Sequence, residues 1–534
     1  ISAIDMNVEI SESYLFDNEP SSISGGISYR GFKLDITNPL TLTIGPSLVE
    51  VRGSSDFNKD SLDLNLLLTD ASTFLINNFW SDSLSGGKAT GSMSLNGSFK
   101  SLGINADLVI NKFEYENISL SSFEFVGKVD NLNDFSDGFF KLKFGKGLWN
   151  GYGFENGTAQ IVLSDTMIEV SSFELKNYDD YLQFNGSISK DTLMVLERFQ
   201  IAYQGHYLIN PRPITINYLT DRFIFNPFQI HVDDGIIDGF IKTNPLQGNL
   251  KFSNVTTDIM TLFESEYSEK IKGNLFGEII ISKNLDQKDI SLDLTLKNGQ
   301  LAKQSFDDFY ISAFYSDGAL HLEEMTLTDG QKTGFQITGR FPILSDTTKL
   351  IQINLQSNFK NIDLTFFTQF LPRWEPYVFG KFTGSFNMGG TTKNTQMDLV
   401  GNIEHAFFGS IPLGSVNSIG HYKSKKFTLT EFSSNWKGNY IKGEAILPID
   451  FDFASTNFQK WVKDEQIIVK TNGYFNSMVF LSENISEVDS ITGDISLNLE
   501  ISGEIDSLLR DGDILIKEGK IHTVLMDEPV SDIY

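Results

Sequence analysis

The chain has 534 residues and a formal net charge of −27, with 69 Asp and Glu against 42 Lys and Arg. This charge repels nucleic acid and gives no electrostatic reason to bind an anionic lipid surface, so nucleic acid is not expected as a partner. The chain has no cysteine, which excludes disulfides, a thiol nucleophile and cysteine-based zinc sites.

Residues 1–66 predict short strands, because apolar and polar residues alternate along them. Leu62, Leu64 and Leu66, for example, are separated by Asp63 and Asn65. We interpret this segment as the end of a truncated repeat, because a more complete version of its pattern follows.

The first full repeat is predicted over residues 67–255. Asp70 can cap a short helix, and the glycines Gly87 and Gly91 follow it. Alternating strands come next, with apolar positions at Met93, Leu95, Leu108 and Ile110. An insertion between Lys190 and Val255 contains several Asn-Pro pairs, and proline beside a strand predicts a strand start or an exposed sheet edge.

The second repeat, residues 256–360, has the fullest pattern. Asp258 can cap a helix reaching Phe263, and Gly273 follows this cap at nearly the interval that separates Gly87 from Asp70. A strand then places alternate leucines on one face. Pairs of a polar residue and glycine predict hairpin turns at Asn298-Gly299, Asp317-Gly318 and Asp329-Gly330. The repeat is therefore one small helix followed by meandering strands.

Two more copies follow, a third repeat over residues 361–475 and the start of a fourth over 476–534. Gly380 follows Asp363, and Gly493 follows Ser477, at nearly the same interval as in the earlier copies. The third copy predicts a helix from Asp363 to Leu371, which could either plug a sheet end or act on a membrane; we favour the plug. Self-similarity over periods this long predicts an extended, stacked architecture.

Catalytic and metal-binding patterns are not found in the sequence. The six histidines are scattered, and the acidic loop Asp130 to Gly138 lacks the EF-hand order, so an acidic turn is favoured over a calcium site. Acidic neighbours such as Asp233 and Asp234 would point to opposite faces of a strand, which disfavours a glycosidase pair. We expect no enzyme activity, metal or cofactor.

The alternation predicts one apolar face for each strand, and such a face must be covered by another sheet, by helices or by a ligand. The predicted helices are too few and too short to cover this face, so the sheet must curl on itself or bind a ligand. The 45 Phe residues suit an apolar lining, or simply fill sheet cores. The expected lining residues are Met93, Leu95, Leu108, Ile110, Leu292, Leu294, Leu296, Phe335, Ile337, Ile351, Ile353, Leu355, Ile495, Leu497, Leu499 and Ile501.

The repeat resembles the TamB/AsmA-like family of bacterial envelope proteins, through its small helix, its Gly-x-x-x-Gly pair, its alternating strands and its closing Phe335-x-Ile-x-Gly339. The resemblance implies an all-β fold with a few short helices, in which an elongated repetitive β-sheet curls into a U-shaped hydrophobic trough. It also implies a periplasmic protein held by an inner-membrane anchor that would lie outside this sequence, with an outer-membrane assembly barrel protein as partner.

The resemblance further implies a conduit that carries phospholipid acyl chains between the inner and outer membranes. The alternative is a periplasmic scaffold that assists outer-membrane protein assembly or secretion by pairing client strands with a sheet edge. A closed β-helix adhesin or polysaccharide enzyme would need a shorter repeat and a cleft rich in Tyr and Trp, and neither is evident in the sequence.

Overall fold

The protein is almost entirely β-strand, which confirms the predicted all-β fold. The structure is a computed structural model that describes residues 3–15, 19–73, 84–133, 136–189, 192–259, 271–282, 289–301, 304–330, 333–343, 350–368, 378–409, 411–451, 459–477, 488–526 and 528–533. The chain divides into two compact units, Ile1–Asn244 (unit 1) and Pro245–Tyr534 (unit 2).

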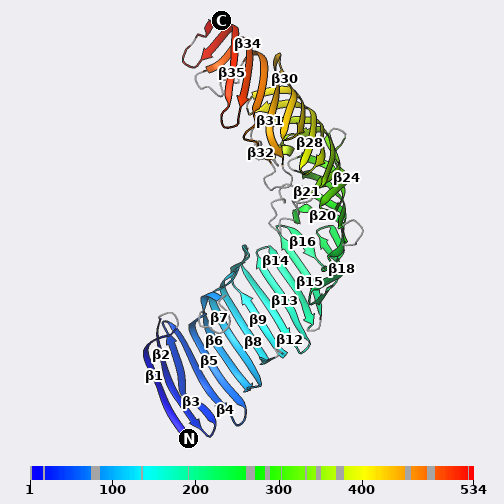
Figure 1. Ribbon diagram of the computed structural model, residues 1–534. Helices are drawn as coiled ribbons and strands as arrows, with labels where there is room; N and C mark the ends of the chain where they lie inside the picture. The colour runs from blue at the N-terminus through cyan, green and yellow to red at the C-terminus, as the bar shows by residue number, and fades with distance from the viewer. Residues whose placement is uncertain are drawn as a thin grey trace. The chain divides into compact units, whose positions relative to one another are not determined.

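Unit 1 is an antiparallel meander in which nearly every strand pairs with the strands before and after it. Figure 1 shows its strands side by side in one layer, coloured blue to green. Its strands are β1 (Ala3–Leu15), β2 (Glu19–Arg30), β3 (Lys33–Ile44), β4 (Ser47–Asp56), β5 (Ser61–Ser72), β6 (Leu84–Ser98), β7 (Ser101–Tyr115), β8 (Ile118–Asn131), β9 (Ser136–Phe144), β10 (Gly147–Trp149), β11 (Tyr152–Phe154), β12 (Asn156–Leu163), β13 (Met167–Asn177), β14 (Asp180–Ser189), β15 (Leu193–Tyr203), β16 (His206–Ile209), β17 (Ile214–Leu219), β18 (Arg222–Val232) and β19 (Gly235–Lys242).

Unit 2 has the same antiparallel order and includes one short helix, α2 (Thr365–Thr368). Its strands are β20 (Gln247–Thr256), β21 (Ile271–Ser282), β22 (Ile290–Leu301), β23 (Gln304–Ser316), β24 (Ala319–Asp329), β25 (Thr333–Pro342), β26 (Gln352–Asp363), β27 (Val378–Thr391), β28 (Asn394–Phe408), β29 (Ile411–Lys423), β30 (Lys426–Trp436), β31 (Asn439–Phe451), β32 (Gln459–Trp461), β33 (Ile467–Ser477), β34 (Val488–Gly503), β35 (Leu509–Thr523) and β36 (Val530–Ile533).

The four glycines that mark the repeats share one backbone geometry. Gly87, Gly273, Gly380 and Gly493 have φ values of 128°, 142°, 138° and 128°, a region that favours glycine. A non-glycine residue in the left-handed region follows each of them on the next strand, at the same interval along the chain in all four repeats. These residues are Lys112 (56°), Asn298 (49°), His405 (52°) and Glu518 (54°). The recurrence is therefore seen in the backbone geometry as well as in the sequence.

The turn predicted at Asn298-Gly299 is wrong, because both residues lie inside β22 and the chain turns only after Leu301. Asn298 is the left-handed residue of a register shift, in which β22 contributes one residue more than β21. Asn-Gly suits this bulge and a hairpin turn for the same reason, because both need a residue with a positive φ. The corresponding pair of the fourth repeat, Glu518-Gly519, also lies inside a strand, β35. The turns at Asp317-Gly318 and Asp329-Gly330 are confirmed as strand ends.

The predicted helix caps have three outcomes. Asp70 is wrong as a cap, because it lies within β5 with φ 48°. Asp363 caps α2 as expected, since its Oδ1 accepts a hydrogen bond from the Thr365 backbone nitrogen at 2.9 Å. Asp258 lies in a short 3₁₀ turn, and Ser477 ends β33. The remaining residues of the predicted helices, 74–83, 260–263, 369–371 and those after Ser477, lie outside the described residues.

Pro211, Pro213 and Pro227 of the insertion lie at interruptions inside the sheet rather than at its exposed edge, whereas Pro245 lies in the turn between β19 and β20. Pro227 lies at a register shift in β18, a strand that is paired on both sides. The segment Asn210–Pro213 separates β16 from β17, while β15 and β18 pair with both. Asn210 is buried there, and its Nδ2 donates to the carbonyls of Leu196, Glu197 and Arg212. A strand break can lie inside a sheet because one amide satisfies the freed backbone groups.

Candidate apolar binding face

Apolar side chains form rows across neighbouring strands of unit 1. In one row, Leu64 of β5 lies opposite Leu95 of β6, which lies opposite Ile104 of β7 and then Val129 of β8. A parallel row joins Leu66, Met93 and Ala106. Because strand side chains alternate, all of these residues share one face of the sheet. The lining residues predicted in this unit all lie on that face: Met93, Leu95, Leu108 and Ile110.

A ladder of phenylalanine rings runs along the same face. Ring centroids are 5.0 Å apart for Phe113 and Phe123, 5.8 Å for Phe123 and Phe144, and 4.5 Å for Phe173 and Phe184. Phe144 of β9 also reaches Phe173 of β13 at 6.3 Å, although β12 lies between these strands. Gly157 and Ala159 of β12 lie opposite these rings and leave room for the contact. Sequence reasoning did not single out this ladder, since the rings meet only through strand register.

The rows recur in unit 2 and join most of the lining residues predicted there. One row consists of Leu294, Ile311, Met325 and Ile337, each opposite the next on the neighbouring strand. Leu296 and Phe335 share the next row, and Leu355 lies opposite Gly339 in a third. Ile495, Leu497 and Leu499 lie opposite Phe475, Gly473 and Thr471. Ile351 is buried and immediately precedes β26.

Much of this face is only partly buried. Met93, Leu95, Leu292, Leu294, Ile337, Leu355, Leu497, Leu499 and Ile501 are half-buried. Leu296, Phe335, Ile353 and Ile495 are buried, each at 4% exposure or less. Side chains in a single-layer sheet are shielded mainly by their neighbours on the same face. The half-buried stretches therefore retain apolar surface that a ligand could cover.

The apolar face is fully packed where the second and third repeats meet, a cluster that we call the sealed junction. It contains Leu296, Phe306, Leu327, Phe335, Phe359, Ile362, Phe366 and Phe382. Phe366 of α2 packs on Phe335 with a centroid distance of 5.5 Å. The helix predicted to plug a sheet end thus packs on the apolar face of the sheet.

A side chain also ties two distant strands together at the sealed junction. Oε1 of Gln304, at the start of β23, accepts a hydrogen bond from the backbone nitrogen of Asp363 at the end of β26, at 3.3 Å. Three strand steps of about 4.8 Å would separate these strands by about 14 Å in a flat sheet. The strand ends must therefore curl toward each other at this edge.

The equivalent place in the next repeat contains a cavity of about 480 Å³, which we call the open junction. It is lined by Phe408, Ile411, Pro412, Leu413, Phe432, Ser434, Trp436, Asn439, Tyr440, Ile441, Phe475 and Leu497. Ser434 is buried, and its hydroxyl donates to the Leu413 carbonyl at 2.6 Å. Most of the lining is apolar, with few polar groups, as is usual in sites for apolar ligands.

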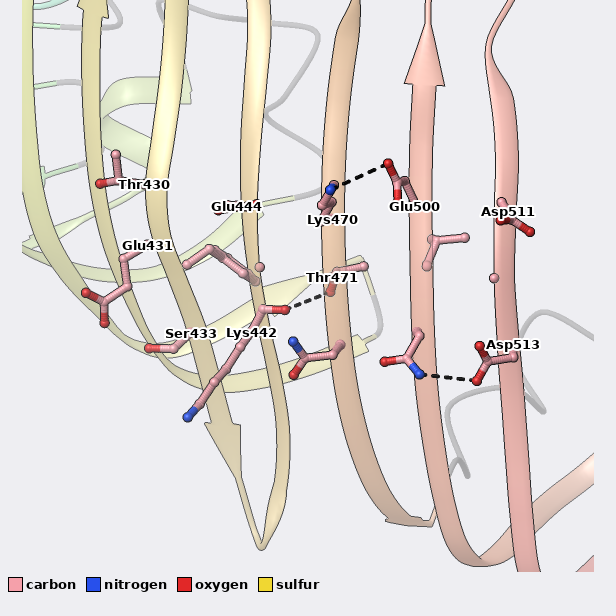
Figure 2. A pocket seen from close by; sticks show the side chains of 16 residues that line it. Thr430, Glu431, Ser433, Lys442, Glu444, Lys470, Thr471, Glu500, Asp511 and Asp513 are labelled. Atoms are coloured by element: carbon pink, nitrogen blue, oxygen red, sulfur yellow. Dashed lines mark hydrogen bonds and ion pairs between the residues drawn. The ribbon is translucent and has the colours of Figure 1, made fainter.

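The opposite face of the same strands is polar. A hollow of about 700 Å³ lies there. Figure 2 shows the labelled Glu431 of β30, Glu444 of β31 and Glu500 of β34 among its lining side chains. Lys470 forms an ion pair with Glu500 at 3.7 Å, drawn as a dashed line. Nearby, a hydrogen bond to Asp494 raises the pKa of the Tyr474 hydroxyl. The Lys470–Glu500 ion pair suits a solvent-exposed face.

Among the described residues, no group of three His, Asp or Glu side chains could hold a metal ion. Within the same ranges, no helix has the length and apolar character needed to cross a lipid bilayer. Comparisons with models of protein families and with curated proteins find no match to this chain.

Proposed function

We propose that the protein is a conduit that carries phospholipid acyl chains along its apolar face, between the inner and outer membranes of a bacterial envelope. The observation that carries this proposal is the set of half-buried apolar rows on one face of the sheet. The envelope location, the inner-membrane anchor and the outer-membrane barrel partner are proposed from the resemblance of the repeat to the TamB/AsmA-like family.

The energetics favour a continuous apolar face over a single specific site. A diacyl lipid has roughly 30 methylenes, and exposing them to water costs about 0.8 kcal/mol each, on the order of 20 kcal/mol in total. Half-buried rows such as Leu64, Leu95 and Ile104 offer apolar surface at strand steps of about 4.8 Å. An acyl chain could therefore move without leaving an apolar environment.

The curvature of the strands supports a trough. Register shifts occur in many strand pairs, for example between Leu68 and Ala71 of β5, and bulges bend and twist a sheet. The hydrogen bond between Gln304 and Asp363 closes one such curved edge. A U-shaped section with the apolar rows inside would leave paired charges such as Lys143 and Glu124 outside, at 2.8 Å.

A photoreactive residue placed on each face tests this function. Substitution at Met93 or Leu294 should give lipid adducts in cells, whereas the neighbouring controls Ser94 and Thr295, which point to the other face, should give few. Peptide adducts at the apolar positions would favour the alternative scaffold function. Equal lipid labelling on both faces, or none on either, would contradict the conduit.

A further inference from the structure

The sealed and open junctions are the same place in two successive repeats. Leu296 follows Gly273 at the same interval as Ile403 follows Gly380. Each begins a row that crosses five strands. The sealed row is Leu296, Phe309, Leu327, Phe335 and Phe359, and the open row is Ile403, Val416, Ser434, Ile441 and Gly473.

Each later member of the open row is smaller than its sealed counterpart. Ser434 stands where the sealed row has Leu327, which is completely buried, and Gly473 stands where it has Phe359. The ring of Phe475 lies over Gly473, 3.0 Å from where a Cβ would be, and recovers part of that space. The remaining space is the cavity of about 480 Å³ between Ser434, Ile441 and Leu497.

The hydrogen bond between Gln304 and Asp363, which we call the strap, has no counterpart among the described residues of the open junction. Ile411 occupies the position of Gln304 in the repeat and cannot accept a hydrogen bond through its side chain. Near the end of β33, the backbone nitrogen of Asn476 instead donates to Oδ1 of Asn439 at 2.9 Å. Asn439 belongs to the adjacent strand β31, so this bond does not draw in the β28–β29 hairpin.

We propose that the open junction is a discrete binding site for one long-chain acyl group of a lipid. The sealed junction indicates the chemistry of the occupant, because there the equivalent space is filled by hydrocarbon side chains such as Leu327 and Phe366. The cavity volume lies within the range of about 300–1,000 Å³ typical of small-molecule sites. This inference rests on the proposed function and adds to it a discrete site at which an acyl chain binds.

Trp436 lines the cavity and reports on its occupant. Bromine-labelled stearic acid added to the full chain should quench the fluorescence assigned to Trp436, by difference from a Trp436→Phe variant. Bromine-labelled phosphatidylglycerol vesicles form the second arm. Quenching in either arm supports the site and identifies its source, free fatty acid or phospholipid. Absence of quenching in both arms overturns the inference.

Two variants that imitate the sealed junction test the cavity itself. Ser434→Leu and Ile441→Phe should each raise the lipid concentration needed for half-maximal quenching by at least about tenfold. Excluding even two methylenes from the cavity would lower the affinity by that factor. Ser433→Leu is the matched control, because Ser433 lies on the other face opposite Lys442 and should bind as the unmodified chain does. Far-ultraviolet circular dichroism checks that each variant is folded. Unchanged quenching in both folded sealing variants would overturn the site.

The inference and the conduit can fail separately. Lipid adducts at Met93 without quenching of Trp436 would overturn the site and leave the conduit standing. Quenching without lipid adducts on the apolar rows would support the site and contradict the conduit.

Discussion

The sealed and open junctions share their backbone pattern and differ in what fills them. Both follow a glycine of positive φ, and both lie on a row that begins on the strand after that glycine, at Leu296 or Ile403. The sealed row contains the three aromatic rings of Phe309, Phe335 and Phe359, whereas the open row contains a serine and a glycine. The two junctions therefore share a backbone pattern, and side-chain size distinguishes the packed junction from the one with a cavity.

The largest effect is expected from Phe335→Ala in the sealed junction. Phe335 contacts Phe309, Phe359 and Phe366, so its loss should cost about 3–5 kcal/mol of local stability. Ile441→Ala at the equivalent open position should cost only about 1 kcal/mol, because that side chain already faces a cavity. Hydrogen exchange of the amides in β22–β27 and in β28–β34 measures the local stability at each position. A local measurement is needed because a chain of two units has no single free energy of unfolding. Equal costs at the two positions would contradict the difference between the junctions.

A smaller effect of opposite sign is expected from Ser434→Leu. Filling the cavity should raise the local stability of β29–β33 by about 0.5–2 kcal/mol, less what the lost hydrogen bond to Leu413 contributes. Protection of the amides in β30 and β31 is the measurement. A loss of protection would mean that the cavity cannot accept a leucine side chain.

The smallest effect is expected from Gln304→Ala, which removes the strap. A neutral hydrogen bond at a sheet edge contributes about 0.5–1.5 kcal/mol, so exchange of the Asp363 amide should quicken while the rest of β26 changes little. Ile411→Ala is the matched change at the open junction, where this side chain cannot form a strap, and it should leave the exchange of the Asn476 amide unchanged. If the Asp363 amide exchanged no faster, Gln304 would not hold that edge.

The sequence predicted the apolar face well, because alternation needs only neighbouring residues. Leu292, Leu294 and Leu296 lie on one face of β22, and the regularly spaced Gly87, Gly273, Gly380 and Gly493 share a positive φ. Asn298-Gly299 was misread because a left-handed residue serves a bulge as well as a hairpin.

The two junctions could not be predicted, because they depend on register between distant residues. Ser434 and Gly473 lie far apart in the sequence, yet each lies opposite Ile441 on one of its two sides. Phe306 of β23 and Phe366 of α2 likewise belong to one cluster. Local periodicity carries no information about such pairs.

Native mass spectrometry of the purified full chain tests the central claim most directly. The account predicts masses that correspond to the protein with bound phospholipid, and loss of those adducts when Leu66, Met93 and Leu95 are replaced together by Asp. Bare protein alone after gentle release from lipid-containing membranes, or adducts that persist unchanged in the triple variant, would contradict an apolar face that holds acyl chains.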